Sequence, residues 1–475
     1  MKTLNVIGYE WKLQFGNGAS ALLMLIFAAV LIYGGLTGKA ARDVRSAAIS
    51  AHHEALSVER EDWLRNLNEL ERLGPAANVP PDTGSAMHVV FASSLPQMPL
   101  ADFAVGQSDL LPYVGEISLW NPDIRLFSKY EFANPVALAL GGFDISRAII
   151  LFLPLLLVVF CFDVIAADRD ARRLGLAVVQ GGSIRGLFWQ RLLFRGALVL
   201  ILTLFCALLM LVFGQQPALI ERLPAFGLWV LLVLAYALFW LLLIAFVASF
   251  NRSGVFNMLS LLGLWAGLTL VIPAAGSALA EALYPTPSRL AYLAEAREVE
   301  NETRLQVAEV ANEFMMDHPE LLVNQSSRIP SYVKSSYLVT SKVDEATRPI
   351  VDEFDDALAS REQVLGVFRF LSPAVAVHGL FNELAGTSAE RHQQYLNQAR
   401  QFKADYAEMA GTNIVAMMPV DSEFSQSLPR FQFADEPLGS RMGRGLGPIV
   451  VLLMLCVVLA FTAHRQLRAA SPLDY

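Results

Sequence analysis

The sequence predicts an all-α polytopic membrane protein with six transmembrane helices and two mainly helical hydrophilic segments on one side of the membrane. Three observations lead to this fold class. The composition is 55% hydrophobic with only 17% charged residues, six apolar runs are long enough to cross a bilayer, and charged residues gather between those runs. A soluble protein has a smaller apolar fraction and a larger charged fraction.

A transmembrane helix needs about 20 largely apolar residues to cross about 30 Å of hydrocarbon. Six runs approach or exceed this length: 19–38, 147–166, 194–214, 224–250, 255–280 and 447–463. The first run follows a stretch that contains Glu10 and is longer than the apolar region of a secretory signal, so we interpret it as a retained span. The last run is flanked by arginines that can snorkel to the membrane surfaces, namely Arg441, Arg444, Arg465 and Arg468. The three cysteines also lie inside these runs, at Cys161, Cys206 and Cys456.

Lys and Arg residues in short loops indicate which way the chain crosses the membrane, because they are retained in the cytoplasm. They gather in residues 1–18, 167–193, 251–254 and 464–475, which share one side if the N-terminus is cytoplasmic. The one short loop left on the other side, 215–223, has a single arginine beside a glutamate. Both termini are therefore expected in the cytoplasm, and both long hydrophilic segments outside it.

The first extracytoplasmic segment, residues 39–146, begins with a long helical pattern. Apolar residues recur at helical spacing from Lys39 onward, without a proline, until Gly74 gives a C-cap signal. We therefore expect one helix that continues span one outward for about 50 Å. Eight prolines between residues 75 and 143 then break the chain into loops and short elements.

The second extracytoplasmic segment, residues 281–446, is the acidic part of the chain. It holds 24 acidic and 15 basic residues, a net charge of −9 against −8 for the whole protein. Two stretches carry apolar residues at helical spacing, and Ser288 and Ser388 are suitable N-caps for them. The simplest arrangement is a mainly helical domain packed against the helix from span one. Since no basic face is present, nucleic acid is not expected as a partner.

No motif for catalysis or metal binding is complete. The nearest approach to a phosphate-binding loop, "GGLTGKA" at 34–40, lacks the first glycine and the final Ser or Thr. "HHEAL" at 52–56 begins like a zinc-peptidase motif, but Ser57 stands where the second histidine is needed. His378 and His392 have no matching Cys or carboxylate cluster, so a metal site there is the minor alternative. We expect a non-catalytic chain without a metal or cofactor of its own.

One polar stretch follows the second apolar run directly. Residues 168–191 read "DRDARRLGLAVVQGGSIRGLFWQR" and hold five arginines, at Arg169, Arg172, Arg173, Arg185 and Arg191. They continue directly from "CFDVIAA" at 161–167. The stretch is too polar for the bilayer and too apolar for a linker. We therefore place it at the edge of the membrane, where an amphipathic helix presents arginines on one side and apolar residues on the other.

This stretch resembles the signature of ABC-2 type permeases between spans two and three, F-D-x-I-A-x-E-R-E-x-G-T-L. The matching positions are Asp163, Ile165, Ala166, Asp168, Arg169, Asp170 and Leu174, with Arg172 and Arg173 where Gly-Thr is usual. Four further stretches, "AVGQSDLLPY", "NPVALALGGFD", "YPTPSR" and "FLSPAVAVHGLFNELAGTSAERH", are similar to those of a poorly characterised bacterial branch with two extracytoplasmic inserts.

The resemblance implies an ABC-2 exporter-like fold in the bacterial cytoplasmic (inner) membrane, with spans two to five in residues 147–280. It also implies an ABC ATPase subunit as partner, with ATP and Mg²⁺ bound on that partner, and a second permease copy or a sister permease beside this chain in the membrane lipid. In such permeases loop 167–193 is a coupling helix that docks on the ATPase. The residues it assigns to coupling are Asp168, Arg169, Asp170, Arg172, Arg173 and Arg185. An apolar stripe in residues 1–18 supports docking, since it predicts an interfacial elbow helix before span one.

Several alternatives stay open. The arginines either dock the ATPase or only anchor the topology, and Asp163 either pairs with Arg169, reaches the headgroups, or has a gating or positioning role. In span five, Asn257, Ser260 and Thr269 either line a transport pathway or bond a neighbouring helix. The function is either transport by an ATP-driven permease, which the resemblance implies is an exporter, or mechanotransmission or assembly, in which the outer domains act on an extracytoplasmic protein and nothing crosses. The long first helix favours the second function.

Overall fold

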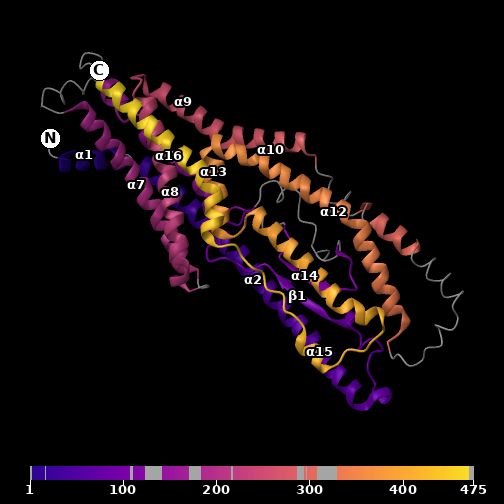
Figure 1. The fold of residues 1–475 in the computed structure, drawn as a ribbon. Helices are drawn as coiled ribbons and strands as arrows, with labels where there is room; N and C mark the ends of the chain where they lie inside the picture. The colour runs from indigo at the N-terminus through magenta and orange to yellow at the C-terminus, as the bar shows by residue number, and fades with distance from the viewer. Residues whose placement is uncertain are drawn as a thin grey trace.

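The computed structural model describes residues 3–16, 18–106, 111–123, 142–170, 183–214, 218–285, 294–295, 297–306 and 329–469. Within these residues the chain is helical apart from one two-stranded hairpin and the connecting segments. Six helices are long and apolar enough to cross a membrane, and both chain termini lie at the same end of the molecule (Figure 1). The prediction of an all-α polytopic membrane protein is confirmed.

Each span overlaps one of the six apolar runs. Span one is the first part of α2 (Ala19–Leu73), and spans two to four are α4 (Ile145–Cys161), α7 (Ile184–Phe213) and α8 (Leu219–Ala248). Span five consists of α9 (Gly254–Ala266), a π-helical stretch, η5 (Gly267–Val271), and α10 (Ile272–Leu283), and span six is α16 (Leu438–Ala469). Helix α7 begins earlier than its apolar run because Ser183 caps it, accepting a hydrogen bond from the Gly186 N–H at 3.4 Å.

A short helix, α1 (Thr3–Phe15), precedes span one and contacts α7. The chain turns from α1 into α2 at Gly18, whose φ of 72° lies in the left-handed region that favours glycine. The helix stands where the sequence predicts an interfacial elbow helix. The buried face of this helix is not the predicted apolar stripe, however, because Trp11 is exposed while Glu10 is fully buried.

Polar side chains repair the backbone of α4 in the middle of the bundle. Pro154 has no N–H, so the Ile150 carbonyl lacks its donor within the helix. The Tyr236 hydroxyl of α8 donates to this carbonyl at 2.9 Å. The Trp265 ring N–H of α9 donates to the next carbonyl, that of Leu151, at 3.1 Å. These bonds tie spans two, four and five together, and they explain why a helix with an internal proline is stable in an apolar bundle.

The two hydrophilic segments fold into one extramembrane domain. Its elements are the distal part of α2, η1 (Gly74–Ala76), η2 (Ala86–His88), β1 (Val90–Ser94), β2 (Val114–Ser118), α12 (Ser331–Leu371), α14 (Ala389–Val415) and α15 (Ser422–Ser427). β1 and β2 are antiparallel, with Val90 opposite Ser118. A single apolar core joins both segments, and Trp63, Phe91, Val333 and Tyr406 belong to it. Figure 1 shows α14, α15 and the hairpin alongside distal α2.

Helix α2 is continuous from the membrane into this domain, as the sequence predicts. It ends at Gly74, whose φ is 60° and whose N–H donates to the Leu70 carbonyl. The helix has 55 residues, which corresponds to about 80 Å. The second predicted cap is also present, since the Ser388 side chain accepts from the Arg391 N–H at the start of α14. The stretch after Ser288 lies largely outside the described residues.

A buried serine joins the extramembrane domain to span five. Ser372 separates α12 from α13 (Pro373–Ala385), a helix that packs against spans two, four and six. The Ser372 hydroxyl caps α13 by accepting a hydrogen bond from the Val375 N–H, and it donates to the Leu268 carbonyl at 2.6 Å. Leu268 lies in η5, where the π-helical geometry alters the backbone hydrogen-bond pattern.

Candidate functional site

Two buried arginines of α7 bind carboxylates from three other parts of the chain near the chain termini. Arg195 contacts Glu10 of α1 through Nε at 2.8 Å and Asp163, just after α4, through Nη1 at 2.6 Å. Arg191 contacts Glu10 through Nε at 2.9 Å and Asp168 of α5 (Ala166–Asp170) through Nη1 at 2.6 Å. We call these five residues the buried charge cluster. It holds α1, α4, α5 and α7 together.

The buried charge cluster is stabilised further by backbone carbonyls at the end of α4. Arg195 Nη1 donates to the Phe160 carbonyl at 2.9 Å, and Arg191 Nη1 donates to the Val164 carbonyl at 3.1 Å. Glu10 is 0% exposed and Arg195 is 1% exposed. Charges this deep are tolerated only when they are paired and hydrogen-bonded. A movement of α5 therefore has to be shared by α1 and α7 unless these bonds break.

The coupling residues predicted from the sequence divide into four groups. Asp168 belongs to the buried charge cluster. Arg169 donates to the Asn251 carbonyl at 2.7 Å and to the Arg252 carbonyl at 2.7 Å, so it binds the α8–α9 turn of its own chain. Arg185 is half-buried in the first turn of α7. The side chain of Asp170 and all of Arg172 and Arg173 lie outside the described residues.

The pairing of Asp163 with Arg169, one of the sequence alternatives, is wrong. Asp163 is bound by Arg195 instead, because Arg195 reaches the end of α4 from the first turns of α7. Arg169 points to the α8–α9 turn, where the Asn251 side-chain oxygen also accepts from it at 2.6 Å. Asp163 therefore has a positioning contact between spans two and three.

The three polar residues of span five lie in different surroundings. Asn257 is buried, and its side-chain amide donates to the Phe162 carbonyl at 3.3 Å, a bond to a neighbouring element. Thr269 is buried in η5, whereas Ser260 is half-exposed. For Asn257 the bond to a neighbour is thus observed.

A second set of buried charges lies at the opposite ends of the spans. Arg222 of α8, 0% exposed, binds both carboxylate oxygens of Asp102 at 2.7 and 2.6 Å. Arg42 of α2 lies 3.7 Å from the same carboxylate. Gly38 permits the approach, since a Cβ there would stand 2.0 Å from the Asp102 carbonyl oxygen. The partner of Arg222 is therefore Asp102 and not the adjacent Glu221.

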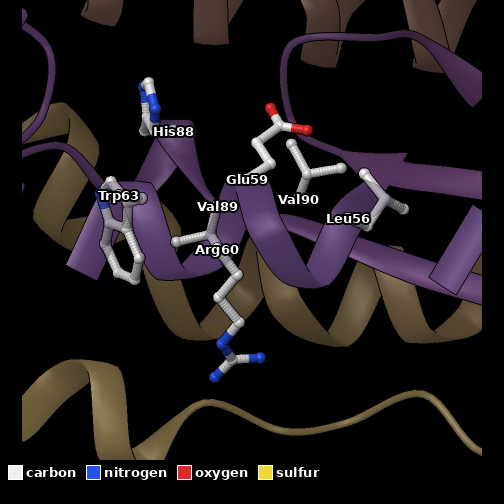
Figure 2. Close-up of a pocket in the computed structure, with 7 residues that line it drawn as sticks. All are labelled: Leu56, Glu59, Arg60, Trp63, His88, Val89 and Val90. Carbon is white, nitrogen blue, oxygen red and sulfur yellow. The ribbon is translucent and has the colours of Figure 1, made fainter. Parts of the chain in front are cut away.

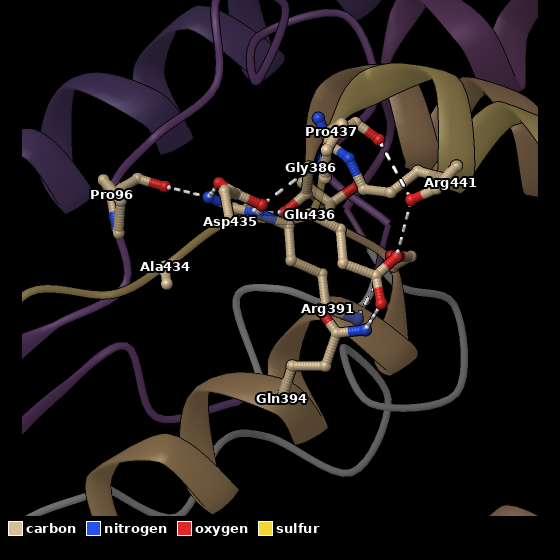
Figure 3. Close-up of polar contacts among 12 residues, drawn as sticks. Pro96, Gly386, Arg391, Gln394, Ala434, Asp435, Glu436, Pro437 and Arg441 are labelled. Carbon is tan, nitrogen blue, oxygen red and sulfur yellow. Dashed lines mark hydrogen bonds and ion pairs between the residues drawn. The ribbon is translucent and has the colours of Figure 1, made fainter. Parts of the chain in front are cut away.

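Buried cations also order the extramembrane domain. Arg391 of α14 binds Asp435 through Nε and Nη2 and donates to the carbonyls of Gly386 and Pro96, both at 2.9 Å (Figure 3). Lys403 lies between Asp123 and Asp344, with Nζ 2.7 Å from each carboxylate. These bonds join α14 to both hydrophilic segments. The prediction that Arg441 snorkels to the membrane surface is wrong, because this side chain is buried beside the Arg391 network.

The histidines make structural contacts. His52 and His53 of α2 contact the hairpin, through the Gly115 carbonyl at 3.0 Å and the Ser94 hydroxyl at 2.8 Å. His378 is half-buried in α13 and His392 is buried in α14. In the ranges that the structure describes, no group of three or more His, Cys, Asp or Glu is arranged to hold a metal. The three cysteines are buried and make no disulfide.

A shallow hollow lies between α2 and the η2–β1 segment (Figure 2). Leu56, Glu59 and Trp63 line one side, and His88 and Val90 the other. Arg60 extends away from the other stick side chains in Figure 2. The space inside is no larger than a water molecule, so the hollow carries no substrate in this conformation.

His378 predicts an acid sensitivity that can be measured. Burial, together with a smaller effect of nearby Arg147, lowers the pKa of His378 to about 4. The folded protein therefore prefers the neutral ring, and this contribution to stability is complete above pH 6.5 and is lost as the pH falls toward 4. Because the side chain is partly exposed, we expect the neutral ring to contribute about 1–2 kcal/mol to the free energy of unfolding. His378→Gln should flatten the pH dependence of thermal unfolding in that window, whereas His464→Gln should not; equal slopes would contradict the prediction.

Sequence reasoning missed the cluster partners Glu10 and Arg195. A signal was present for Arg195, which lies inside the predicted span 194–214, where a charge is costly unless it is paired. Glu10 gave none, since it stands in a polar N-terminal stretch. Only the packing of α1 against α7 identifies it as a buried partner.

Comparison with known proteins identifies one similarity. Residues 289–434 match the family described as "Domain of unknown function (DUF3526)". The match covers about a third of the chain and contains the described helices α12, α13, α14 and α15. No curated protein and no solved structure matches the chain. The similarity is therefore confined to the second hydrophilic segment and carries no stated activity.

Proposed function

We propose that the chain is the membrane subunit of an ATP-driven transporter of the ABC-2 type, in the bacterial cytoplasmic membrane with both termini in the cytoplasm. A separate ATPase subunit, which holds ATP and Mg²⁺, drives it, and a second copy or a sister permease completes the membrane unit. The observation that carries the proposal is the buried charge cluster. It includes Asp168 and Arg191, which stand at the two ends of the arginine-rich stretch that resembles a coupling helix, and it connects both to α1 and to the end of α4.

In this proposal the cluster transmits force. When ATP binding brings two ATPase subunits together, each presses on the segment that follows α5. Asp168 passes the displacement to Arg191, and Glu10 couples Arg191 to Arg195. Arg195 holds the end of α4 through Asp163, so spans two and three move as one body. The gap between two membrane subunits then changes without any chemistry on this chain.

The test of coupling is charge reversal in the segment after α5. We expect Arg172→Glu/Arg173→Glu to abolish co-purification of the partner ABC ATPase and its hydrolysis of ATP in lipid discs, because acidic partner groups would then be repelled. Arg465→Glu/Arg468→Glu is the matched control, since it reverses two arginines at the C-terminal end of span six. Equal binding by both double variants would leave the arginines as topology anchors.

A second function, mechanotransmission, is favoured by the continuity of α2. One helix joins the bundle to the far end of the extramembrane domain, so a tilt of span one would displace that domain. Ser50 lies on an exposed surface of this helix between the two regions. Ser50→Pro would interrupt it, while Ser50→Ala would not. If ATP-driven displacement of a spin label at Met418 is lost in the proline variant and kept in the alanine variant, the helix transmits motion to the extramembrane domain. Displacement that persists in Ser50→Pro would contradict this function, and movement of a substrate across the membrane would favour transport.

A further inference from the structure

A small hollow lies where span six meets the surface of the membrane, between α12, α13 and α16. Arg369, Gly379, Glu383, Arg441 and Arg444 are among the residues that line it. Its position follows from the sequence, because Arg441 and Arg444 precede the apolar run 447–463 by one to two helical turns. This is the level of the lipid headgroups.

Two buried side chains in this hollow have polar atoms without a partner among the described residues. Arg441 is 3% exposed, and its Nε and Nη1 make no hydrogen bond. Its nearest carboxylate, Asp435, is 3.8 Å away and is bound by Arg391. Glu383 is 8% exposed, and its Oε2 has no partner. Such atoms are rare in proteins because each costs free energy, so they indicate an occupant.

The other two arginines of the hollow are already neutralised. Arg369 forms an ion pair with Glu362, and Arg444 binds Glu390 at 3.0 Å and Glu436 at 2.6 Å. Two donors of Arg441 and one carboxylate oxygen of Glu383 remain without a hydrogen bond, on two helices, and the two side chains do not form an ion pair with each other. A ligand that fits must therefore present an anion and a hydrogen-bonding cation together.

We propose that this hollow binds the headgroup of a zwitterionic phospholipid with a primary amine. The phosphate accepts hydrogen bonds from Arg441, and the ammonium donates to Glu383. Exposed apolar side chains next to the hollow, Phe370 and Leu446, receive the start of an acyl chain. The enclosed space has room for about one water molecule, so the headgroup enters when the partly exposed Arg369 and Arg444 side chains swing outward.

Burial agrees with this assignment. Burial raises the pKa of Glu383, although Ser388, Arg444 and Arg441 act in the opposite direction. An ammonium group at Oε2 would return the carboxylate to its charged form. The proposal does not depend on the transport function, because it concerns a lipid site in the membrane subunit alone.

The test is native mass spectrometry of the full chain released from discs that contain equal amounts of phosphatidylethanolamine and phosphatidylglycerol. We expect one retained phosphatidylethanolamine per chain, with about tenfold preference over phosphatidylglycerol. Arg441→Gln should lower this retention about tenfold, and Glu383→Gln should remove the preference between the two lipids. Arg465→Gln, at the other end of the same helix, should change neither.

A filling variant separates binding from folding. A Cβ at Gly379 would stand 3.6 Å from Arg369 Nε, an ordinary contact, so Gly379→Leu can occupy the hollow without removing a charge. It should abolish lipid retention while the thermal unfolding temperature is unchanged or rises. Retention in Gly379→Leu equal to wild type, or no preference for phosphatidylethanolamine in wild type, would overturn the proposal. So would full competition by soluble phosphoethanolamine, which would show a site for a free metabolite instead.

Discussion

Arg195→Met is expected to lower the free energy of unfolding by about 3–5 kcal/mol, because it leaves Glu10 and Asp163 as buried carboxylates without their cation. Methionine fills a similar volume, so the loss reflects charge and hydrogen bonding more than a cavity. Thermal or denaturant unfolding in detergent micelles measures it. Arg185→Met is the matched control, since it removes a half-buried arginine from the first turn of the same helix and should cost less than about 1 kcal/mol.

A compensating variant tests whether the cost comes from unpaired charge. Adding Glu10→Gln and Asp163→Asn to Arg195→Met neutralises both stranded carboxylates, so a part of the stability should return. If the triple variant is no more stable than the single one, the arginine acts through packing and the interpretation of the buried charge cluster is wrong. Co-purification of the ATPase with the triple variant would then show whether the protein can bind the ATPase without the buried charges.

Asp102→Asn is expected to have an effect of similar size, about 3–5 kcal/mol, at the opposite ends of the spans. The substitution keeps the shape of the side chain but removes the one anion between Arg42 and Arg222, so two buried guanidiniums then face each other. The same unfolding measurement applies. Asp43→Asn, which alters an exposed aspartate of α2 that pairs with Lys39, is the control and should change stability by less than about 0.5 kcal/mol.

Removing one of the two cations should partly rescue this variant. Adding Arg42→Gln to Asp102→Asn relieves the repulsion while Arg222 keeps its bonds to the carbonyls of Leu211 and Gly214. An Asp102→Asn protein as stable as wild type would mean that these carbonyls alone satisfy Arg222. The interpretation that Asp102 anchors α2 to α8 would then be wrong.

Local sequence was sufficient to predict those elements whose structure depends on their own residues and not on distant contacts. The six spans follow from runs of apolar residues, because a backbone in hydrocarbon has to satisfy its hydrogen bonds within a helix. The long α2 follows from its helical period without proline and from the glycine at its end. The N-cap at Ser388 follows from residue type. The hairpin was not specified, since eight prolines indicate loops without saying which residues pair.

The sequence by itself determined that this is a multi-pass helical protein with charged edges, and it singled out the segment after span two as the place to look for coupling. Only the tertiary structure decided which charges meet. Glu10 and Arg195 are 185 positions apart, and Asp102 and Arg222 are 120 apart. It also decided that the two hydrophilic segments share one core. Ion pairs and apolar cores depend on distances in space, and no local pattern in the chain contains those distances.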